Sequence, residues 1–261
     1  MKSFNKLKVV ILAGGLGSRL DSITKFLPKP LVKIGRLPII IHIINIFAIQ
    51  GLSNFYLATG YKSIEFLKYF KKKRIGKIIN DKSSNKSQIK IKINKKICNL
   101  TLFNTGINAM TGGRVKSIAD HINDETFFLT YGDGLANVNI KKLFSFHVKN
   151  KKLATVTAVN PPARFGELTI KHSKVINFSE KKLIKSAWIN GGFFVIQKDF
   201  IKFIKNKKSI LERTPLEQAV KFNQLSAYKH KGFWQCMDTR RDRDKLINLV
   251  KKNKLPWLNI K

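Results

Sequence analysis

Residues 9–30 read VVILAGGLGSRLDSITKFLPKP, and this stretch decides the fold at the start of the chain. Its first three residues are β-branched, which predicts a short buried strand that enters a turn. The turn is rich in glycine, and because glycine has no Cβ, the backbone there can curl around an anion and point N–H groups at it. These glycines are Gly14, Gly15 and Gly17. The stretch therefore predicts a strand followed by an anion-binding loop.

Two cations follow the loop and favour a polyphosphate as the anion. Arg19 carries a planar guanidinium that suits phosphate oxygens. Lys29 lies between Pro28 and Pro30, which restrict the local backbone. The loop is neither a Walker loop, because it lacks the Gly-Lys-Ser/Thr ending, nor a dinucleotide fingerprint, because Leu20 stands at the place of the third glycine. A plain strand-to-helix turn would explain the glycines, but it requires neither cation.

The composition indicates a globular protein. The chain has 261 residues, of which 43% are hydrophobic, enough to bury a substantial core. No apolar run approaches the length of a membrane span, so we expect no membrane partner. Cys98 and Cys236 are isolated and lack metal-ligand spacing, which predicts a reducing, cytoplasmic location.

The formal net charge is +36, from 51 Lys and Arg against 15 Asp and Glu. Such a charge raises the hypothesis of a nucleic-acid-binding protein. However, Lys dominates over Arg and is spread along the chain, whereas a dedicated patch would more often combine Arg with aromatic residues. We therefore favour solvated lysine-rich faces over a nucleic-acid partner. The resulting field would still attract anionic substrates.

Strand and helix signals alternate along the chain. Strands are predicted at 7–13, 54–59, 86–102 (more than one), 126–130, 154–160, 168–171, 175–178 and 192–196. Helices are predicted at 38–50, 63–73, 114–122, 140–149, from Thr214 and from Thr239 to about 252, the last two opened by capping boxes. This rhythm predicts an α/β protein with a parallel sheet flanked by helices, in one domain over residues 1–261.

Two aspartates are candidates for binding Mg²⁺. Asp133 lies in a Tyr-Gly-Asp-Gly segment directly after an apolar run, and this places it at the carboxyl end of a central strand, where open α/β sheets bind ligands. Asp238 precedes the last predicted helix. Mg²⁺ is commonly held by one or two carboxylates together with phosphate oxygens and water. Each aspartate could also be a simple turn residue.

Three further segments carry weaker signals. Residues 110–114, MTGGR, form a second glycine turn that opens a helix, and Arg114 could meet a phosphate there. Residues 178–181 and 188–192 supply charged and amide side chains at strand ends, which suit sugar hydroxyls and a second phosphate. Each of these segments alone is more often turn or surface chemistry.

Taken in order, the motifs resemble those of the sugar-phosphate nucleotidyltransferases, which join a nucleoside triphosphate to a sugar 1-phosphate. The matching segments are LAGGLGSRL (12–20), the Lys29 segment, MTGGR (110–114), LTYGDGL (129–135), LATVTAVNPPARFGEL (153–168), WINGGFFV (188–195) and GFWQCMDTRRD (232–242). The first motif and YGDG are shared across the family, whereas MTGGR, PPARFGEL and GFWQCMDT together point to its cytidylyl branch.

The resemblance implies a Rossmann-like, open and mostly parallel sheet flanked by helices, with a smaller β-rich element on the sugar side. It implies CTP and glucose 1-phosphate as substrates and Mg²⁺ as the metal ion, and we expect a homo-oligomer. The alternatives are UTP or dTTP as the nucleotide, or another sugar 1-phosphate. A non-catalytic sensor and a nucleic-acid-binding protein are weaker alternatives.

The resemblance also assigns residues. The nucleotide would be bound by Leu12, Ala13, Gly14, Gly15, Leu16, Gly17, Ser18, Arg19, Lys29, Thr111, Gly113, Arg114 and Gly132. The sugar phosphate would be bound by Glu180, Lys181, Asn190 and Gly191. The metal ion would be held by Asp133 and Asp238, and the catalytic residues would be Arg19, Lys29 and Asp133.

The chain departs from the family pattern at a few positions. Lys182 replaces the proline of a Glu-Lys-Pro segment, and Leu27 stands where a basic residue is common. Arg36 and Leu37 take the places of two glycines, with Gly35 shifted by one. These departures bear on the identity of the sugar rather than on the core reaction.

Overall fold

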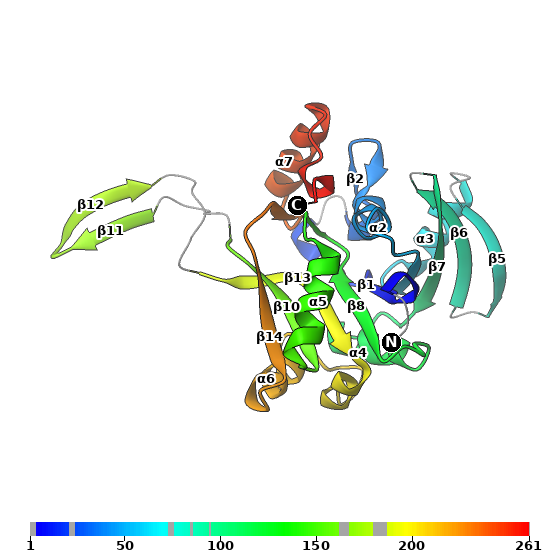
Figure 1. The fold of residues 1–261 in the computed structure, drawn as a ribbon. Coiled ribbons are helices and arrows are strands. Elements are labelled where there is room, and N and C mark those ends of the chain that lie inside the picture. Colours follow the sequence, from blue (N-terminus) through cyan, green and yellow to red (C-terminus); the bar gives the residue numbers. More distant parts are fainter. Residues whose placement is uncertain are drawn as a thin grey trace.

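The computed structural model describes residues 4–20, 24–72, 76–83, 86–93, 95–161, 167–179 and 187–260. Its centre is one nine-stranded sheet, and β1 (Lys8–Leu12) lies in the middle of that sheet (Figure 1). In spatial order the strands are β14 (Leu225–His230), β10 (Ala154–Val159), β13 (Ile189–Gln197), β8 (Thr126–Tyr131), β1, β4 (Asn54–Thr59), β7 (Lys96–Asn104), β6 (Lys86–Ile93) and β5 (Gly76–Ser83).

The sheet is mixed but mostly parallel. Two of the nine strands, β13 and β6, run opposite to the other seven. The parallel centre consists of β8, β1, β4 and β7, so the carboxyl ends of these strands meet at one edge. The predicted Rossmann-like α/β class is therefore confirmed.

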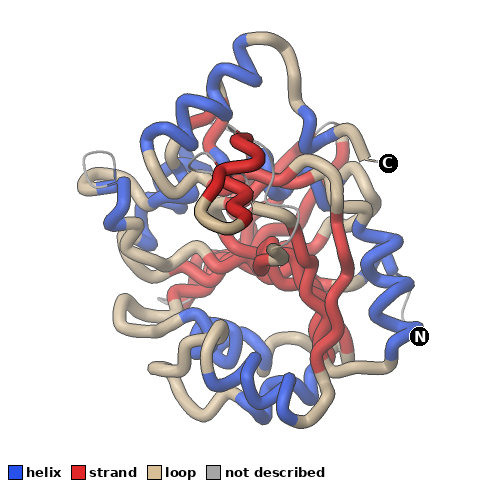
Figure 2. Tube along the Cα trace, turned by 90° about the vertical axis from the view of Figure 1, so that its left-hand side faces the viewer, coloured by secondary structure: helices blue, strands red, loops and turns tan. Residues whose placement is uncertain are grey.

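Helices cover both faces of the sheet, as Figure 2 shows. They are α2 (Ile39–Ala48), α3 (Ser63–Lys72), α4 (Thr111–Ala119), α5 (Ile140–Asn150), α6 (Thr214–Lys221) and α7 (Arg240–Lys251). On one face, α2, α3, α5 and α7 enclose the larger hydrophobic core, whereas α4 and α6 enclose a second core on the other face.

The apolar run in β1 follows from this burial on both faces. Val9 and Ile11 belong to the larger core, and Val10 and Leu12 belong to the second core. Successive side chains of a strand point to opposite faces, so a strand buried on both sides must be apolar at every position. The predicted strand at the start of the chain is thus confirmed, and it is the element on which both layers pack.

Three helix starts differ from the prediction, and the smallest difference is at α2, which begins at Ile39 with Pro38 as its N-cap. Helix α4 begins at Thr111 rather than at Arg114, because a segment around Lys207–Ser209 packs against its first turn so closely that a Cβ on Gly112 or Gly113 would clash with it. The glycine pair is therefore part of the helix and serves this close approach.

The capping box predicted at Thr214 is wrong. The N-cap of α6 is Arg213, and no side chain caps it. The Glu217 N–H already donates to the Arg213 carbonyl at 2.9 Å, so the helical bonds begin one residue earlier and Thr214 lies inside the first turn. The box at Thr239 is confirmed, with bonds in both directions between Thr239 and Asp242.

Small β elements complete the fold. The hairpin of β11 (Glu167–Lys171) and β12 (Lys174–Ser179) projects from the sheet and is the smaller β-rich element (Figure 1). Strand β9 (Gly134–Ala136) pairs with β15 (Trp234–Cys236), and β2 (Lys33–Ile34) pairs with β3 (Leu37–Pro38). None of the helices within the described residues has the length and apolar character needed to span a membrane.

Candidate functional site

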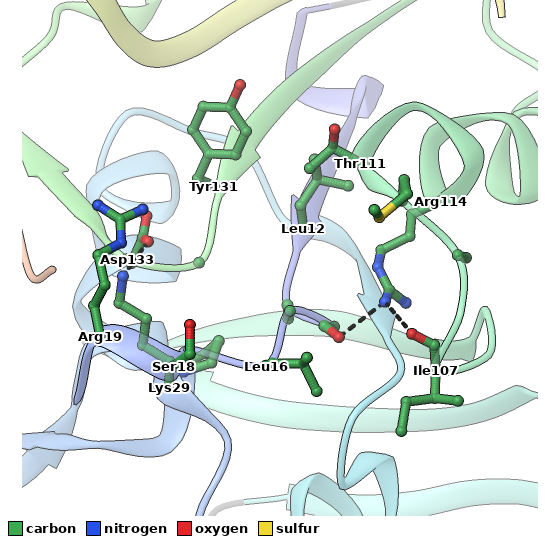
Figure 3. A pocket seen from close by; sticks show the side chains of 18 residues that line it. Leu12, Leu16, Ser18, Arg19, Lys29, Ile107, Thr111, Arg114, Tyr131 and Asp133 are labelled. Carbon is green, nitrogen blue, oxygen red and sulfur yellow. Dashed lines mark hydrogen bonds and ion pairs between the residues drawn. The ribbon is translucent and has the colours of Figure 1, made fainter. Parts of the chain in front are cut away.

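A cavity of about 440 Å³ opens at the carboxyl ends of β1 and β8 (Figure 3). Leu12 and Tyr131, the last residues of these two parallel strands, lie next to each other in register. The other residues around the cavity are Ala13, Gly14, Gly15, Leu16, Gly17, Ser18, Arg19, Lys29, Pro30, Ile107, Ala109, Met110, Thr111, Arg114, Gly132 and Asp133. Its size is typical of a small-molecule site, and its position is where open α/β sheets bind ligands.

The glycine loop forms one wall of this cavity. Gly17 has φ +69°, a left-handed conformation that glycine adopts without strain. Within the described part of the chain, no hydrogen bond uses the backbone N–H groups of residues 14–19. These donors are therefore available to the oxygens of a phosphate chain.

Arg114 supports the loop from behind. Its guanidinium is buried and donates to the carbonyl oxygens of Gly14 and Thr59 and to the Thr105 hydroxyl, at 2.9, 3.1 and 2.6 Å. It also donates to the carbonyl of Gly106 at 2.9 Å. Burial lowers the pKa of Arg114. Most of the donor groups of this side chain are thus used by backbone carbonyls and by the Thr105 hydroxyl, and the predicted contact with a phosphate stays a prediction.

Four charged side chains converge on the opposite side of the cavity. The Lys29 ammonium donates to Asp133 Oδ2 and to Asp238 Oδ1, each at 2.6 Å. The Arg19 guanidinium donates to Asp238 Oδ2 at 2.8 Å. The side chain of Lys29 is 11% exposed, whereas that of Arg19 is 72% exposed. Burial lowers the pKa of Lys29, but the attraction and hydrogen bonds of the two aspartates outweigh burial, so the net pKa is raised and the ammonium stays charged.

The backbone brings the two aspartates together. Strand β9 follows Asp133 directly, and its partner β15 ends two residues before Asp238. In addition, the Met237 N–H donates to the Asp133 carbonyl at 2.8 Å. A pairing between two short strands far apart in the sequence thus creates the predicted pair of carboxylates.

This pair suits a divalent cation. One oxygen from each carboxylate reaches the same Lys29 nitrogen, so both already converge on a single positive charge. The described residues contain no cluster of three or more His, Cys, Asp or Glu that could hold a metal ion by itself. Two carboxylates completed by phosphate oxygens and water are a common Mg²⁺ arrangement, and they require no third protein ligand.

Of the remaining candidates for binding the nucleotide, two line the cavity and one does not. Gly132 lines the cavity, and its N–H donates to the Leu12 carbonyl at 2.9 Å, which holds the end of β8 against the end of β1. Thr111 also lines the cavity, and its hydroxyl donates to Glu212. Gly113 is not among the lining residues, because its N–H is turned to the Ser209 carbonyl at 3.1 Å.

The sugar-side candidates divide into two pairs. Glu180 and Lys181 lie outside the described residues. Asn190 and Gly191 lie near the start of β13, and the Asn190 amide donates to the Tyr131 hydroxyl at 3.2 Å. The Gly191 carbonyl accepts a hydrogen bond from the Trp234 indole at 2.8 Å.

Two polar residues of the site were not predicted from the sequence. Tyr131 lines the cavity, and its place directly before Gly-Asp-Gly is a signal that could have identified it. Glu212 hydrogen-bonds to both Thr111 and Tyr131. No local motif marks Glu212, because its partners lie in segments remote from it along the chain.

Comparison with known proteins identifies a protein family and several relatives of this chain. Residues 8–238 match the family described as Nucleotidyl transferase. The chain is 41% identical over 255 residues to glucose-1-phosphate cytidylyltransferase of Salmonella typhimurium, covering 96% of this chain and 98% of the relative. It is 36% identical over 250 residues to a Bacillus subtilis protein named probable glucose-1-phosphate cytidylyltransferase, covering 95% of this chain and 96% of the relative. Among solved structures, HddC from Yersinia pseudotuberculosis has the same fold, with a TM-score of 0.70 at 24% identity and coverage of 94% of this chain and 99% of the other.

Proposed function

Because the chain belongs to the nucleotidyl transferase family, we propose that it transfers a cytidylyl group from CTP to glucose 1-phosphate, giving CDP-glucose and pyrophosphate. The observation that carries this proposal is the charged cluster beside the glycine loop, in which one ammonium contacts both aspartates. The names of relatives that are 41% and 36% identical to the chain support the choice of nucleotide and sugar.

The cavity suits a nucleoside triphosphate. Backbone N–H groups of residues 14–19 provide donors for the phosphate chain, and Arg19 and Lys29 provide positive charge at one end. Apolar side chains at Leu16, Ile107 and Met110 are 59%, 58% and 47% exposed around the same cavity. A flat base and a sugar could cover this apolar surface, which is otherwise in contact with water.

The reaction is an in-line displacement at the α-phosphorus of CTP. A phosphate oxygen of glucose 1-phosphate forms a bond to that phosphorus, and the bond to the oxygen bridging the α- and β-phosphates breaks. Pyrophosphate leaves with the electron pair of the broken bond. No protein nucleophile is required, because the attacking oxygen is already anionic.

The protein contributes alignment and charge. Two anions that repel each other must be held in line. Because the protein holds them in this geometry, positioning can lower the barrier substantially. Lys29 and Arg19 would stabilise negative charge on the departing pyrophosphate. Asp133 and Asp238 would hold Mg²⁺, and when bound this ion neutralises charge on the phosphate oxygens. The Gly14 to Gly17 loop would orient the triphosphate through its N–H groups.

We propose the same residues for binding as the resemblance implied, with two changes of role. Arg114 supports the loop from behind through the Gly14 carbonyl, and Gly113 allows a neighbouring segment to approach α4. Asn190 and Gly191, together with Glu180 and Lys181, are proposed to receive the sugar phosphate.

The direct test is an activity matrix with purified protein and Mg²⁺. CTP, UTP, dTTP and GTP would each be combined with glucose 1-phosphate, galactose 1-phosphate and mannose 1-phosphate. Pyrophosphate release would be measured with a coupled assay, and the nucleotide sugar would be identified by mass spectrometry. We expect CTP with glucose 1-phosphate to be preferred, and Asp133→Asn to abolish product formation. A clear preference for another pair would overturn this substrate assignment.

We also propose a single nucleotidyltransferase domain over residues 1–261, a cytoplasmic location and a homo-oligomer. Free thiols at Cys98 and Cys236 support the location, since disulfides are rare in the cytoplasm. Exposed apolar side chains on the β11–β12 hairpin support self-association, with Val175, Ile176 and Phe178 exposed by 54%, 60% and 62%. Sedimentation velocity of the purified protein tests the oligomer, and a monomer at micromolar concentration would contradict it.

A further inference from the structure

One carboxylate connects the two sides of the cavity. Glu212 lies in the segment before α6, and its two oxygens accept hydrogen bonds from two hydroxyls. The Thr111 hydroxyl donates to Oε2 at 2.6 Å, and the Tyr131 hydroxyl donates to Oε1 at 2.5 Å. Thr111 begins α4 on the nucleotide side, and Tyr131 ends β8, two residues before Asp133. Figure 3 shows Thr111 and Tyr131 with both hydroxyls directed to the same side of the cavity.

The hydrogen bonds continue from Tyr131 to Asn190. The Asn190 Nδ2 group donates to the Tyr131 hydroxyl at 3.2 Å, and Asn190 Oδ1 accepts from the Gly192 N–H at 2.8 Å. Glu212, Tyr131, Asn190 and Gly192 therefore form one chain of hydrogen bonds from the loop before α6 to β13.

The groups at the two ends of this chain of hydrogen bonds determine which partner donates in each bond. A carboxylate can only accept, so the Tyr131 proton must point to Glu212. A backbone N–H can only donate, so the Asn190 atom that faces Gly192 must be its oxygen. The Asn190 NH₂ group is consequently turned to Tyr131, and no other acceptor among the described residues takes the second of its two N–H bonds.

The segment that carries Glu212 is anchored without the carboxylate. The Met110 N–H donates to the Lys207 carbonyl at 2.9 Å, and the Leu211 N–H donates to the Thr111 hydroxyl at 2.9 Å. The Lys116 ammonium donates to the Ile204 carbonyl at 2.7 Å. Moreover, no Lys or Arg within the described residues forms an ion pair with Glu212. The charge of Glu212 is thus not needed to attach the loop. Acidic residues are few in this protein, 15 against 51 Lys and Arg, so a carboxylate at this position calls for another role.

We propose that Glu212 is a positioning residue for the sugar 1-phosphate: through Tyr131 it holds the Asn190 amide with its free N–H directed to an oxygen of that substrate. Through Thr111 the same carboxylate ties this amide to the helix that borders the nucleotide. This inference rests on the proposed function. It adds that a residue outside the cavity lining controls the binding of the sugar 1-phosphate.

The test compares two conservative variants with a matched control. Glu212→Gln keeps the shape but lets the new amide donate to Tyr131, which allows the tyrosine proton to turn toward Asn190. Tyr131→Phe removes the hydroxyl and keeps the ring against Phe194, whose centroid lies 6.0 Å away. Glu217→Gln, five residues along and exposed on α6, is the control. Circular dichroism melting would verify that all variants are folded.

We expect the KM for glucose 1-phosphate to rise about five- to tenfold in Glu212→Gln and Tyr131→Phe, the size of effect that loss of one hydrogen bond produces. The dissociation constant of CTP, measured by calorimetry, should change less than about twofold in Tyr131→Phe. Both changes interrupt the same chain of hydrogen bonds. The KM of the double variant for glucose 1-phosphate should therefore be no higher than that of the more impaired single variant.

A purely structural role would lower the melting temperature and leave the KM for glucose 1-phosphate unchanged, and this result would overturn the inference. Additive effects in the double variant would overturn it as well. If the wild type and Glu217→Gln both form no nucleotide sugar, the proposed function fails, and this inference fails with it. Normal product formation with unchanged Michaelis constants in both variants would overturn only the inference.

Discussion

At Lys29, a single ammonium is hydrogen-bonded to both aspartates that are proposed to hold the metal ion. The ammonium and a divalent cation would therefore compete for the same carboxylate oxygens. When a metal-bound triphosphate binds, its oxygens offer Lys29 a new set of acceptors, and the carboxylates become free for the metal ion. The charge of the site is thus balanced before and after the substrate binds.

Replacement of Lys29 by methionine should separate these two roles. Without the ammonium, Mn²⁺ should bind the nucleotide-free protein roughly tenfold more tightly, because the cation that contacts both Asp133 and Asp238 is gone, although Arg19 still contacts Asp238. The rate of product formation should fall by about 10²–10³, since one charged group that stabilises the leaving pyrophosphate is lost. Electron paramagnetic resonance titration measures the Mn²⁺ affinity, and Lys33→Met, an exposed neighbour, is the control. Equal Mn²⁺ affinity in Lys29→Met and the wild type would contradict the competition.

At the scale of a single element, the first turn of α7 positions Asp238. Asp242 Oδ2 accepts hydrogen bonds from the backbone N–H groups of Asp238 and Thr239, at 3.2 and 2.9 Å. The Thr239 hydroxyl accepts from the Asp242 N–H at 3.2 Å, which completes the capping box. The cap therefore stabilises the helix and also holds the backbone of a residue proposed to bind the metal ion.

Asp242→Ala should reduce both stability and activity. We expect the free energy of unfolding to fall by about 1–2 kcal/mol, the cost of losing an N-cap interaction. Product formation should fall as well, because the Asp238 backbone loses its support. Urea denaturation and the coupled assay measure the two effects. Asp244→Ala is the matched control, since that side chain lies on the same helix, is 66% exposed and makes only a 3.9 Å ion pair with Arg243 among the described residues. Equal effects of the two substitutions would exclude this role of the cap.

Helix α5 gives the fold a dependence on pH that is separate from the site. His147 on this helix is 1% exposed, and its Nδ1 lies 2.8 Å from the Thr155 hydroxyl of β10. Burial lowers the pKa of His147 from 6.5 to about 4. Between these values the unfolded chain binds a proton that the folded chain does not, so stability is lost as the pH falls.

The expected loss from this histidine is about 2 kcal/mol between pH 7 and pH 5. His147→Gln cannot take up the proton, so its free energy of unfolding should fall less over the same interval. Urea denaturation at both pH values, with the exposed His172→Gln as control, measures the difference. If wild type and His147→Gln lose the same stability, His147 does not titrate as its burial implies.

Over the whole molecule, the formal charge of +36 creates a field that attracts the anionic substrates, whereas acidic groups are few. Among these few, Asp133 and Asp238 lie at the site, Glu212 beside it, and Asp242 supports the turn after Asp238. Four of the 15 acidic residues thus lie at or beside the site, where cations and hydroxyl groups must be held.

This field should make substrate capture sensitive to salt. We expect kcat/KM for CTP to fall roughly three- to tenfold as NaCl is raised from about 20 mM to about 500 mM, because salt screens the attraction. The kcat at saturating substrates should change much less, since bound phosphates are shielded from the solvent ions. Steady-state kinetics across the salt series measures both quantities. An unchanged kcat/KM would indicate that the lysines act only as solvated surface groups.

Residues that are close along the chain were predictable, because their chemistry is written into a short motif. The strand before the glycine loop, the loop itself and Lys29 lie within 22 residues, and their types alone predict a polyphosphate site. The pair Asp133 and Asp238 needed the motif order and the resemblance as well, since neighbouring positions in space do not follow from distant positions in sequence.

The direction in which a side chain points was not predictable. Arg114 was expected to meet a phosphate, and the sequence did not indicate that its guanidinium also contacts carbonyls of the loop, of the end of β4 and of the segment after β7. Glu212 was not identified at all, because its partners Thr111 and Tyr131 come from other elements. By itself, the sequence determined the apolar central strand, the phosphate-binding loop and the types of charge at the site, all of which depend on local chemistry. Only the tertiary structure decided which carboxylate meets which cation and which hydroxyl, because those contacts depend on the pairing of β9 with β15 and on the packing of the segment before α6 against α4.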